Sequence, residues 1–135
     1  MSSLSSIFDG VIEESSMVVP IAILKELAQE LNKRTKGLLF ARVEPKIHSD
    51  GNLFALDFYI TAPSLNNYSY DAFTVIHDLG LYPLKIWNSS NNLIAEADNQ
   101  EEFEKGLKLI FSSPEIKKVI NGLLAQAKQV DDSYY

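Results

Sequence analysis

Two histidines each lie near an aspartate, an arrangement that could orient an imidazole ring as a general base. His77 directly precedes Asp78, and one residue separates His48 from Asp50. The residues around His77 favour a β-strand, in which neighbouring side chains point to opposite faces, so the Asp78 carboxylate is poorly placed to bond the His77 ring. We therefore interpret His77 as the end of a strand and Asp78 as the start of a turn. The same interpretation applies to His48 and Asp50.

The sequence gives little support for other catalytic sites or for a metal site. The histidines could meet across a sheet and bind a metal with Asp57 or Asp71, but the ligand spacing of a motif such as HExxH is absent. Asp57 and Asp71 could also face each other as the paired carboxylates of a glycosidase. The sequence contains no GxSxG or SxxK motif, no glycine-rich phosphate loop and no cysteine. We predict no catalytic residue, metal or cofactor, and a hydrolase that uses His48 or His77 is the alternative.

A group of aromatic residues indicates a binding surface. On one strand of the predicted sheet, apolar residues alternate with Asp57 and Tyr59, so helices that cover the apolar face leave these two side chains on the other. Tyr68, Tyr70 and Trp87 join them if the strand register places all of them on the same side. Tyr and Trp combine a large contact area with a polar group, which is typical of protein interfaces. We predict a partner-binding surface that consists of Tyr59, Tyr68, Tyr70, Trp87 and Asp57. In the alternative, a larger core or the N-terminal arm covers these rings.

Hydrophobic periodicity predicts the elements that position these residues. Apolar residues three and four apart predict a helix from about Pro20 to Lys36. The period then changes to two, which is typical of strands. Strands are expected at 39–47, 54–61, 68–77, 82–87 and 93–97. Pro45 cannot donate a hydrogen bond, so it places the first strand at an edge or marks a bulge. The segment 68–78 also fits a helix capped by Ser69, but its β-branched and aromatic residues favour the strand.

The C-terminal part of the chain predicts two helices. Asp98 is expected to cap the first of them, with Glu101 three residues later as its capping-box partner. Ser113 is expected to cap the second helix, and Pro114 occupies its first position, where the missing amide hydrogen costs no bond.

These elements predict a single α+β domain over residues 1–135. Its sheet is an antiparallel meander of four to five strands, because the connections between successive strands are short. One N-terminal helix and two C-terminal helices pack on one face of this sheet. We interpret residues 1–16 as a loosely ordered N-terminal arm and residues 130–135 as a mobile tail. A short docked helix is the alternative for the arm.

The charge of the chain narrows the classes of partner. A net charge of -6 and a sequence pI near 4.8 disfavour nucleic acids and anionic membranes and leave room for a basic protein. The basic residues gather at Lys33, Arg34, Lys36, Arg42 and Lys46. We interpret them as the complement of a helix dipole and a solvated strand face. The beginning of the chain lacks the basic region of a signal peptide, and the apolar stretches are short, so we expect a cytoplasmic protein.

The size, acidity and α+β layout resemble those of bacterial immunity proteins and secretion chaperones, a likeness at the level of the fold. We therefore expect a non-catalytic protein that binds another protein through the aromatic sheet face or a strand edge. A free edge or face could also support homo-oligomers. The alternative is a small-molecule-binding protein in which the curved sheet and the helices form a cup lined by Tyr59, Tyr70 and Trp87.

Overall fold

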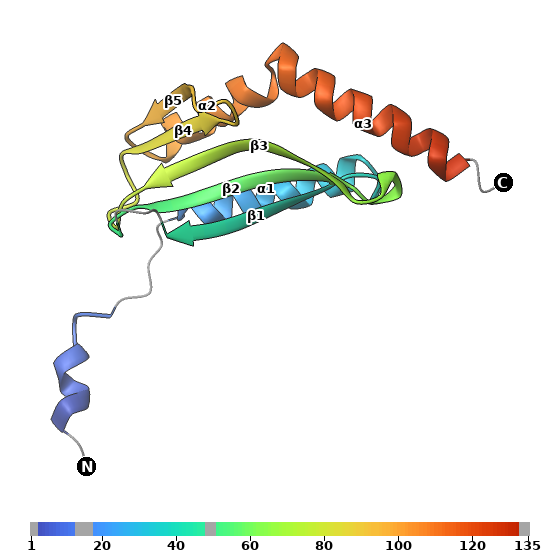
Figure 1. Cartoon of the computed structure of the whole chain (residues 1–135). Helices are drawn as coiled ribbons and strands as arrows, with labels where there is room; N and C mark the ends of the chain where they lie inside the picture. The colour runs from blue at the N-terminus through green and yellow to red at the C-terminus, as the bar shows by residue number, and fades with distance from the viewer. Residues whose placement is uncertain (1–2, 13–17, 48–50, 133–135) are drawn as a thin grey trace.

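The computed structural model in Figure 1 describes residues 3–12, 18–47 and 51–132. Within these ranges the chain forms five strands, three α-helices and two short 3-10 helices. The strands are β1 (Phe40–Ile47), β2 (Phe54–Ala62), β3 (Tyr68–His77), β4 (Leu84–Asn88) and β5 (Leu93–Ala97). The helices are η1 (Ser3–Phe8), α1 (Pro20–Arg34), η2 (Pro63–Leu65), α2 (Gln100–Phe111) and α3 (Pro114–Asp132). The predicted α+β fold is confirmed, as is the strand at β3.

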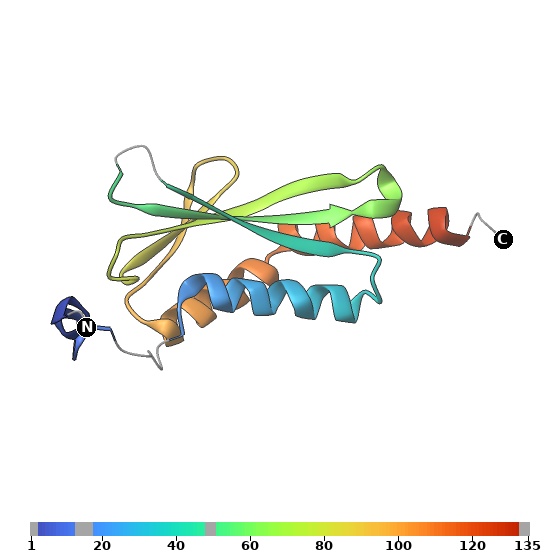
Figure 2. The same cartoon turned by 90° about the horizontal axis from the view of Figure 1, so that it is seen from below.

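The sheet is an antiparallel meander with the spatial order β1-β2-β3-β4-β5, as predicted. Short turns join successive strands, so each strand pairs with the one that precedes it in the sequence. Figure 2 shows α1, α2 and α3 on the same side of this sheet. We call the opposite side, over which no described element lies, the open face.

The core lies between the sheet and the helices and contains a cluster of phenylalanines. Phe58 of β2 and Phe73 of β3 are fully buried and stack with their ring centroids 4.9 Å apart. Phe111 of α2 packs edge-on against both rings, at 5.7 Å from Phe58 and 5.8 Å from Phe73. These contacts fix α2 over the middle of the sheet.

Thr35 joins the end of α1 to the start of β1. Its hydroxyl donates to the carbonyl oxygen of Leu31 at 2.9 Å and accepts from the amide of Leu39 at 3.1 Å. Gly37 follows with a φ of +82°, a conformation that glycine adopts without strain. This compact turn orients β1 so that it packs under α1.

The cap of α2 differs from the prediction by one residue. The side chain of Asn99, not Asp98, accepts from the amide of Glu102 at 2.9 Å. Glu102, not Glu101, in turn accepts from the amide of Asp98 at 2.7 Å. The preceding Ala97 is buried at the end of β5, so the chain needs Asp98 to leave the sheet before the helix begins.

The second C-terminal helix starts as predicted and runs further. Ser113 accepts from the amide of Ile116 at 3.4 Å, and Pro114 occupies the first position of α3. The helix continues to Asp132, so it includes positions 130–132 of the predicted tail, and positions 133–135 lie outside the described residues.

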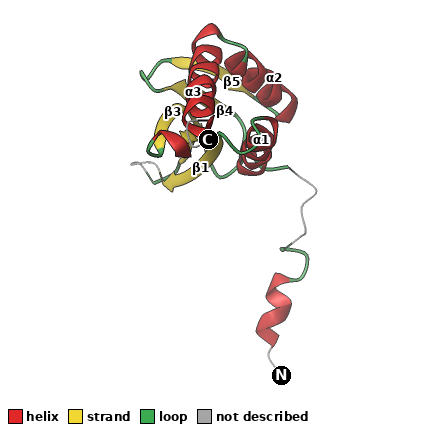
Figure 3. Ribbon diagram, turned by 90° about the vertical axis from the view of Figure 1, so that its right-hand side faces the viewer, coloured by secondary structure: helices red, strands yellow, loops and turns green. Residues whose placement is uncertain are grey.

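The N-terminal arm lies apart from the sheet in Figures 1 and 3. It contains η1, and its large apolar side chains are more than half exposed. These residues are Leu4, Ile7, Phe8, Val11 and Ile12. The described part of this segment therefore has an unburied apolar stripe, and positions 1–2 and 13–16 of the predicted arm lie outside the described residues.

A bulge in β3 decides which side chains face the helices. Phe58 pairs with Phe73, but the next residue, Tyr59, pairs with Asp71, so Ala72 is an extra residue in β3. The alternation of side chains is therefore interrupted at Ala72. The residues before the bulge lie on the opposite face from the one that uninterrupted alternation predicts.

Candidate functional site

The open face carries three of the five residues predicted to bind a partner. Asp57 pairs with Thr74 across β2 and β3, and Thr74 pairs with Trp87 across β3 and β4. Tyr59 lies two residues from Asp57, so its side chain is on the same face. Both Tyr59 and Trp87 are half-buried. The structure thus brings Asp57, Tyr59 and Trp87 together on neighbouring strands.

Asp57 is a fully bonded carboxylate. It is 8% exposed and accepts from the hydroxyl of Thr74 at 2.6 Å, while the ammonium group of Lys46 lies 2.7 Å from its other oxygen. Through these bonds Asp57 connects β1, β2 and β3. The hydrogen bond to Asp57 and then the negative charge of Asp57 raise the pKa of the Lys46 ammonium group. We infer that these two bonds of Asp57 fix the positions of β1, β2 and β3 relative to one another on the open face.

Tyr59 has a cationic neighbour. The guanidinium carbon of Arg42 lies 4.8 Å from the centroid of the Tyr59 ring, which is a cation–π arrangement. Arg42 also forms an ion pair with Glu44 at 2.8 Å. With Lys46 held by Asp57 and Arg34 paired with Glu30, three residues of the predicted basic concentration are bound within the chain.

Asp71 is a partly buried acidic group of the open face. Its Oδ1 atom is buried and has no hydrogen-bond partner. Burial raises the pKa of the Asp71 carboxyl, the negative charge of Asp57 raises it further, and Lys46 opposes this shift. Asp57 and Asp71 therefore lie close enough on the open face for their negative charges to repel each other.

We expect Asp71→Asn to raise the free energy of unfolding at neutral pH. Because folding raises the pKa of this carboxyl, the folded chain binds the proton more tightly, and ionisation destabilises it. This destabilisation begins as the pH rises above the ordinary pKa of 3.8 and is complete above the raised pKa. The advantage of Asp71→Asn over the parent protein should grow across that window in urea denaturation. Glu96→Gln, which neutralises an exposed carboxyl, should show no such trend.

Tyr68 and Tyr70 lie on the helix side of the sheet. Tyr68 pairs with the buried Ala62, and Tyr70 pairs with the buried Ile60. The hydroxyl of Tyr70 donates to Glu115 of α3 at 3.4 Å. Uninterrupted alternation along β3 would place both rings on the open face with Tyr59, but the bulge at Ala72 puts them on the opposite side. A cup lined jointly by Tyr59, Tyr70 and Trp87 is excluded for the same reason.

The two tyrosines instead line a groove beside α3. We call it the α3 groove; its volume is about 600 Å³. Its walls are formed by Leu65, Tyr68, Tyr70, Glu115, Lys118, Val119, Gly122, Leu123 and Gln126. Tyr68 is 50% exposed, so one aromatic ring at this groove is accessible from solvent.

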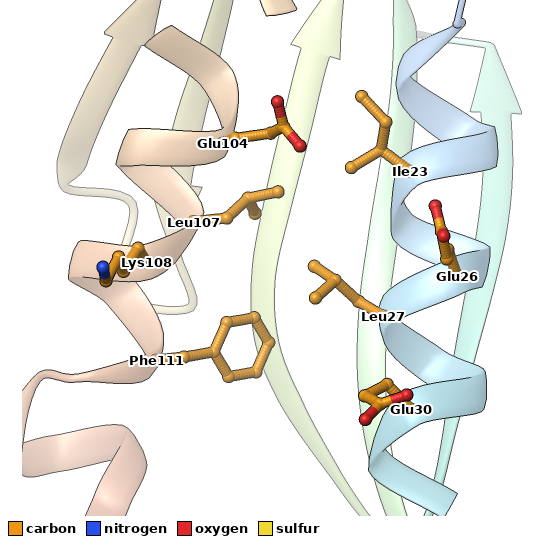
Figure 4. A pocket seen from close by; sticks show the side chains of 8 residues that line it. All are labelled: Ile23, Glu26, Leu27, Glu30, Glu104, Leu107, Lys108 and Phe111. Atoms are coloured by element: carbon orange, nitrogen blue, oxygen red, sulfur yellow. The ribbon is translucent and has the colours of Figure 1, made fainter. Parts of the chain in front are cut away.

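A further groove lies between α1 and α2, and the sequence analysis did not predict it. Figure 4 shows side chains of the two helices facing each other across it. We call it the α1–α2 groove; its volume is about 510 Å³. Its lining residues are Ile23, Glu26, Leu27, Glu30, Glu104, Leu107, Lys108 and Phe111. The acidic residues beside each apolar stripe are visible in the sequence, but the distance between the two helices is not.

The chain was compared with protein families, with curated proteins and with solved structures. No family model, curated protein or solved structure matches the chain. In the described part of the chain, no helix combines the length and the apolar character needed to cross a membrane.

His77 does not bond the Asp78 carboxylate. Its Nδ1 atom lies 2.8 Å from the main-chain oxygen of Asp78, and its ring stacks on Phe54 at 5.6 Å. The Asp78 carboxylate accepts from the amide of Gly80 at 2.8 Å, so it closes the turn after β3, as predicted. His48 and Asp50 lie outside the described residues. Among the described residues, no three histidine or acidic side chains gather to hold a metal ion.

Proposed function

We propose that this chain is a cytoplasmic, non-catalytic protein that binds another protein through the open face of its sheet. The observation that carries the proposal is the position of Tyr59 and Trp87. Both rings lie half-buried on a sheet face over which no described element packs. Aromatic anchors of this kind contribute most of the binding energy in many interfaces.

The arrangement around the rings supports binding without rearrangement. Asp57 is fixed by Thr74 and Lys46, and Arg42 is held over Tyr59, so these side chains lose little freedom when a partner docks. The partner would be held or occluded, as immunity proteins and secretion chaperones do with theirs. The overall negative charge favours a basic partner. Homo-oligomers would form through β1 or β5, the strands at the two edges of the sheet. Pro45 has no amide hydrogen, so β1 lacks one of the hydrogen-bond donors that pairing with another strand uses.

The variant Tyr59→Ala/Trp87→Ala tests this proposal. We expect it to weaken binding of the partner that co-purifies from the native host at least about tenfold, the equivalent of about 1.4 kcal/mol. Its melting temperature should change little, because both rings are only half-buried. The measurement is titration of the purified partner by calorimetry.

Tyr68→Ala is the matched control, since it removes an exposed ring from the helix side of the same sheet. It should leave partner binding unchanged. Equal losses in the two variants, or a large loss of stability in Tyr59→Ala/Trp87→Ala, would contradict the proposal.

A small-molecule-binding function is the second candidate, and the α3 groove favours it. Its volume of about 600 Å³ falls in the range of ligand sites, and it combines apolar walls with the polar groups of Tyr70, Glu115 and Lys118. A ligand whose binding depends on Tyr68 and not on Trp87 would support this function in place of the first.

A further inference from the structure

We infer that the α1–α2 groove is a second docking site and that its occupant is a basic amphipathic helix of a protein partner. The site is separate from the open face, because it lies on the helix side of the sheet (Figure 4). The inference therefore goes beyond the proposed function and does not depend on Tyr59 or Trp87.

The floor of the groove is apolar and firmly supported. Ile23 and Leu107 are 7% and 4% exposed, and Leu27 and Phe111 are partly buried beside them. Phe111 in turn packs edge-on against Phe58 of the core. An incoming apolar stripe would therefore meet side chains that are already held in place, so docking costs little reorganisation.

Carboxylates flank this floor on both sides. Glu26 and Glu30 project from α1 and Glu104 from α2, and Lys108 is the basic residue among those that line the groove. Glu30 is paired with Arg34 at 2.8 Å. Glu26 and Glu104 are exposed and form no ion pair or hydrogen bond with another described residue. Two free negative charges across an apolar floor match a ligand with an apolar stripe and basic residues on both sides of it.

The walls of the groove favour a helix over a strand. Both walls are α-helices, whose backbone groups are bonded internally, so the groove offers side chains but no free strand edge for an extended peptide. The stretch of α1 from Ile23 to Glu30 spans about 10 Å at 1.5 Å per residue. This length accommodates about two turns of a helix.

Charge favours a basic partner over two other possible occupants of the groove, the N-terminal arm and a second copy of the chain. The N-terminal arm has the apolar spacing to fill the groove, but Asp9 lies in it and Glu13 and Glu14 follow in the sequence. These acids would approach Glu26 and Glu104. A second copy of the chain carries the same net charge of -6. Like charges at close range are repelled, so a basic partner is the occupant that the groove fits.

Titration with designed peptides tests the inference. The first probe is a fluorescent helical peptide of about 18 residues, with leucines at helical spacing and lysines elsewhere. A second peptide has glutamates in place of the lysines, and a third has serines in place of the leucines. With the full chain at low salt, we expect the lysine–leucine peptide to bind at least about tenfold more tightly than either of the others in fluorescence anisotropy.

Charge reversal locates the site. Glu26→Lys/Glu104→Lys should weaken binding of the lysine–leucine peptide at least about tenfold. Glu44→Lys/Glu96→Lys changes the net charge by the same amount on the open face and should leave binding within about twofold. Both pairs are at or near the surface, so circular dichroism should show that all variants fold. Trp87→Ala should also leave peptide binding unchanged, which separates this site from the proposed function.

Several outcomes would overturn the inference. Equal affinity for the lysine and glutamate peptides would remove the charge argument, and an equal loss in both reversal pairs would place the peptide elsewhere. If Phe8→Asp strengthens peptide binding, the N-terminal arm is the occupant. If sedimentation shows a dimer that Glu26→Lys/Glu104→Lys changes, the occupant is a second copy.

Discussion

Phe58→Ala is expected to lower the free energy of unfolding by about 3–5 kcal/mol, the range measured for buried phenylalanines. Phe58 has no exposed surface, stacks on Phe73 and receives the edge of Phe111. Its removal leaves a cavity that touches β2, β3 and α2 at once, so the surroundings can collapse only partly. Urea denaturation followed by circular dichroism measures the loss. Since small proteins are stable by only about 5–15 kcal/mol, this variant should be close to unfolding.

Phe40→Ala is the matched control for this substitution. Phe40 lies on β1, and 46% of its surface is exposed. Removing the same atoms there creates no cavity, so the free energy of unfolding should fall by less than about 1 kcal/mol. Similar losses at the two positions would show that the phenylalanine cluster does not dominate the core.

Gly106→Leu is expected to destabilise the protein by about 1–3 kcal/mol, because α2 lies very close to the sheet at this position. A Cβ atom at Gly106 would lie 3.3 Å from the Cβ of Ala95 and 3.4 Å from the Cδ1 of Ile86. The rest of a leucine side chain has no room there, so α2 must move away from β4 and β5. Thermal unfolding measures the effect.

The same substitution in α3 should have the opposite sign. A Cβ atom at Gly122 would meet nothing within 4 Å, since this residue faces the α3 groove. Leucine is a better helix former than glycine, so Gly122→Leu should raise the free energy of unfolding by up to about 1 kcal/mol. A lower free energy of unfolding in Gly122→Leu, or an unchanged one in Gly106→Leu, would contradict the observed packing of the two helices.

Local patterns predicted most elements because each of them carries its own signal. The change of period from 3.6 to two after α1 located the strands, and Pro114 located the start of α3. The position of the α2 cap depended on more than local sequence, since Asp98 and Asn99 are both good capping residues. The burial of Ala97 decides between them, and burial depends on contacts with the helices.

The candidate surfaces were less predictable for a related reason. Tyr59, Trp87 and Asp57 follow the alternation of their own strands, and their common face was predicted. Tyr68 and Tyr70 belong to a continuous alternating segment, and nothing in that segment marks Ala72 as extra. The α1–α2 groove depends on the distance between helices that are far apart in the sequence, which periodicity does not contain.

The extra residue in β3 also has an evolutionary consequence. Deletion of one codon, that of Ala72, would restore regular alternation and keep the pairs on both sides of the bulge, Phe58 with Phe73 and Tyr59 with Asp71. Tyr68 and Tyr70 would stay on the helix side, and Ser69 and Asp71 would stay on the open face. The gain or loss of this single codon therefore changes the local twist of β3 and leaves unchanged the side chains that each face presents to its neighbours in the cell.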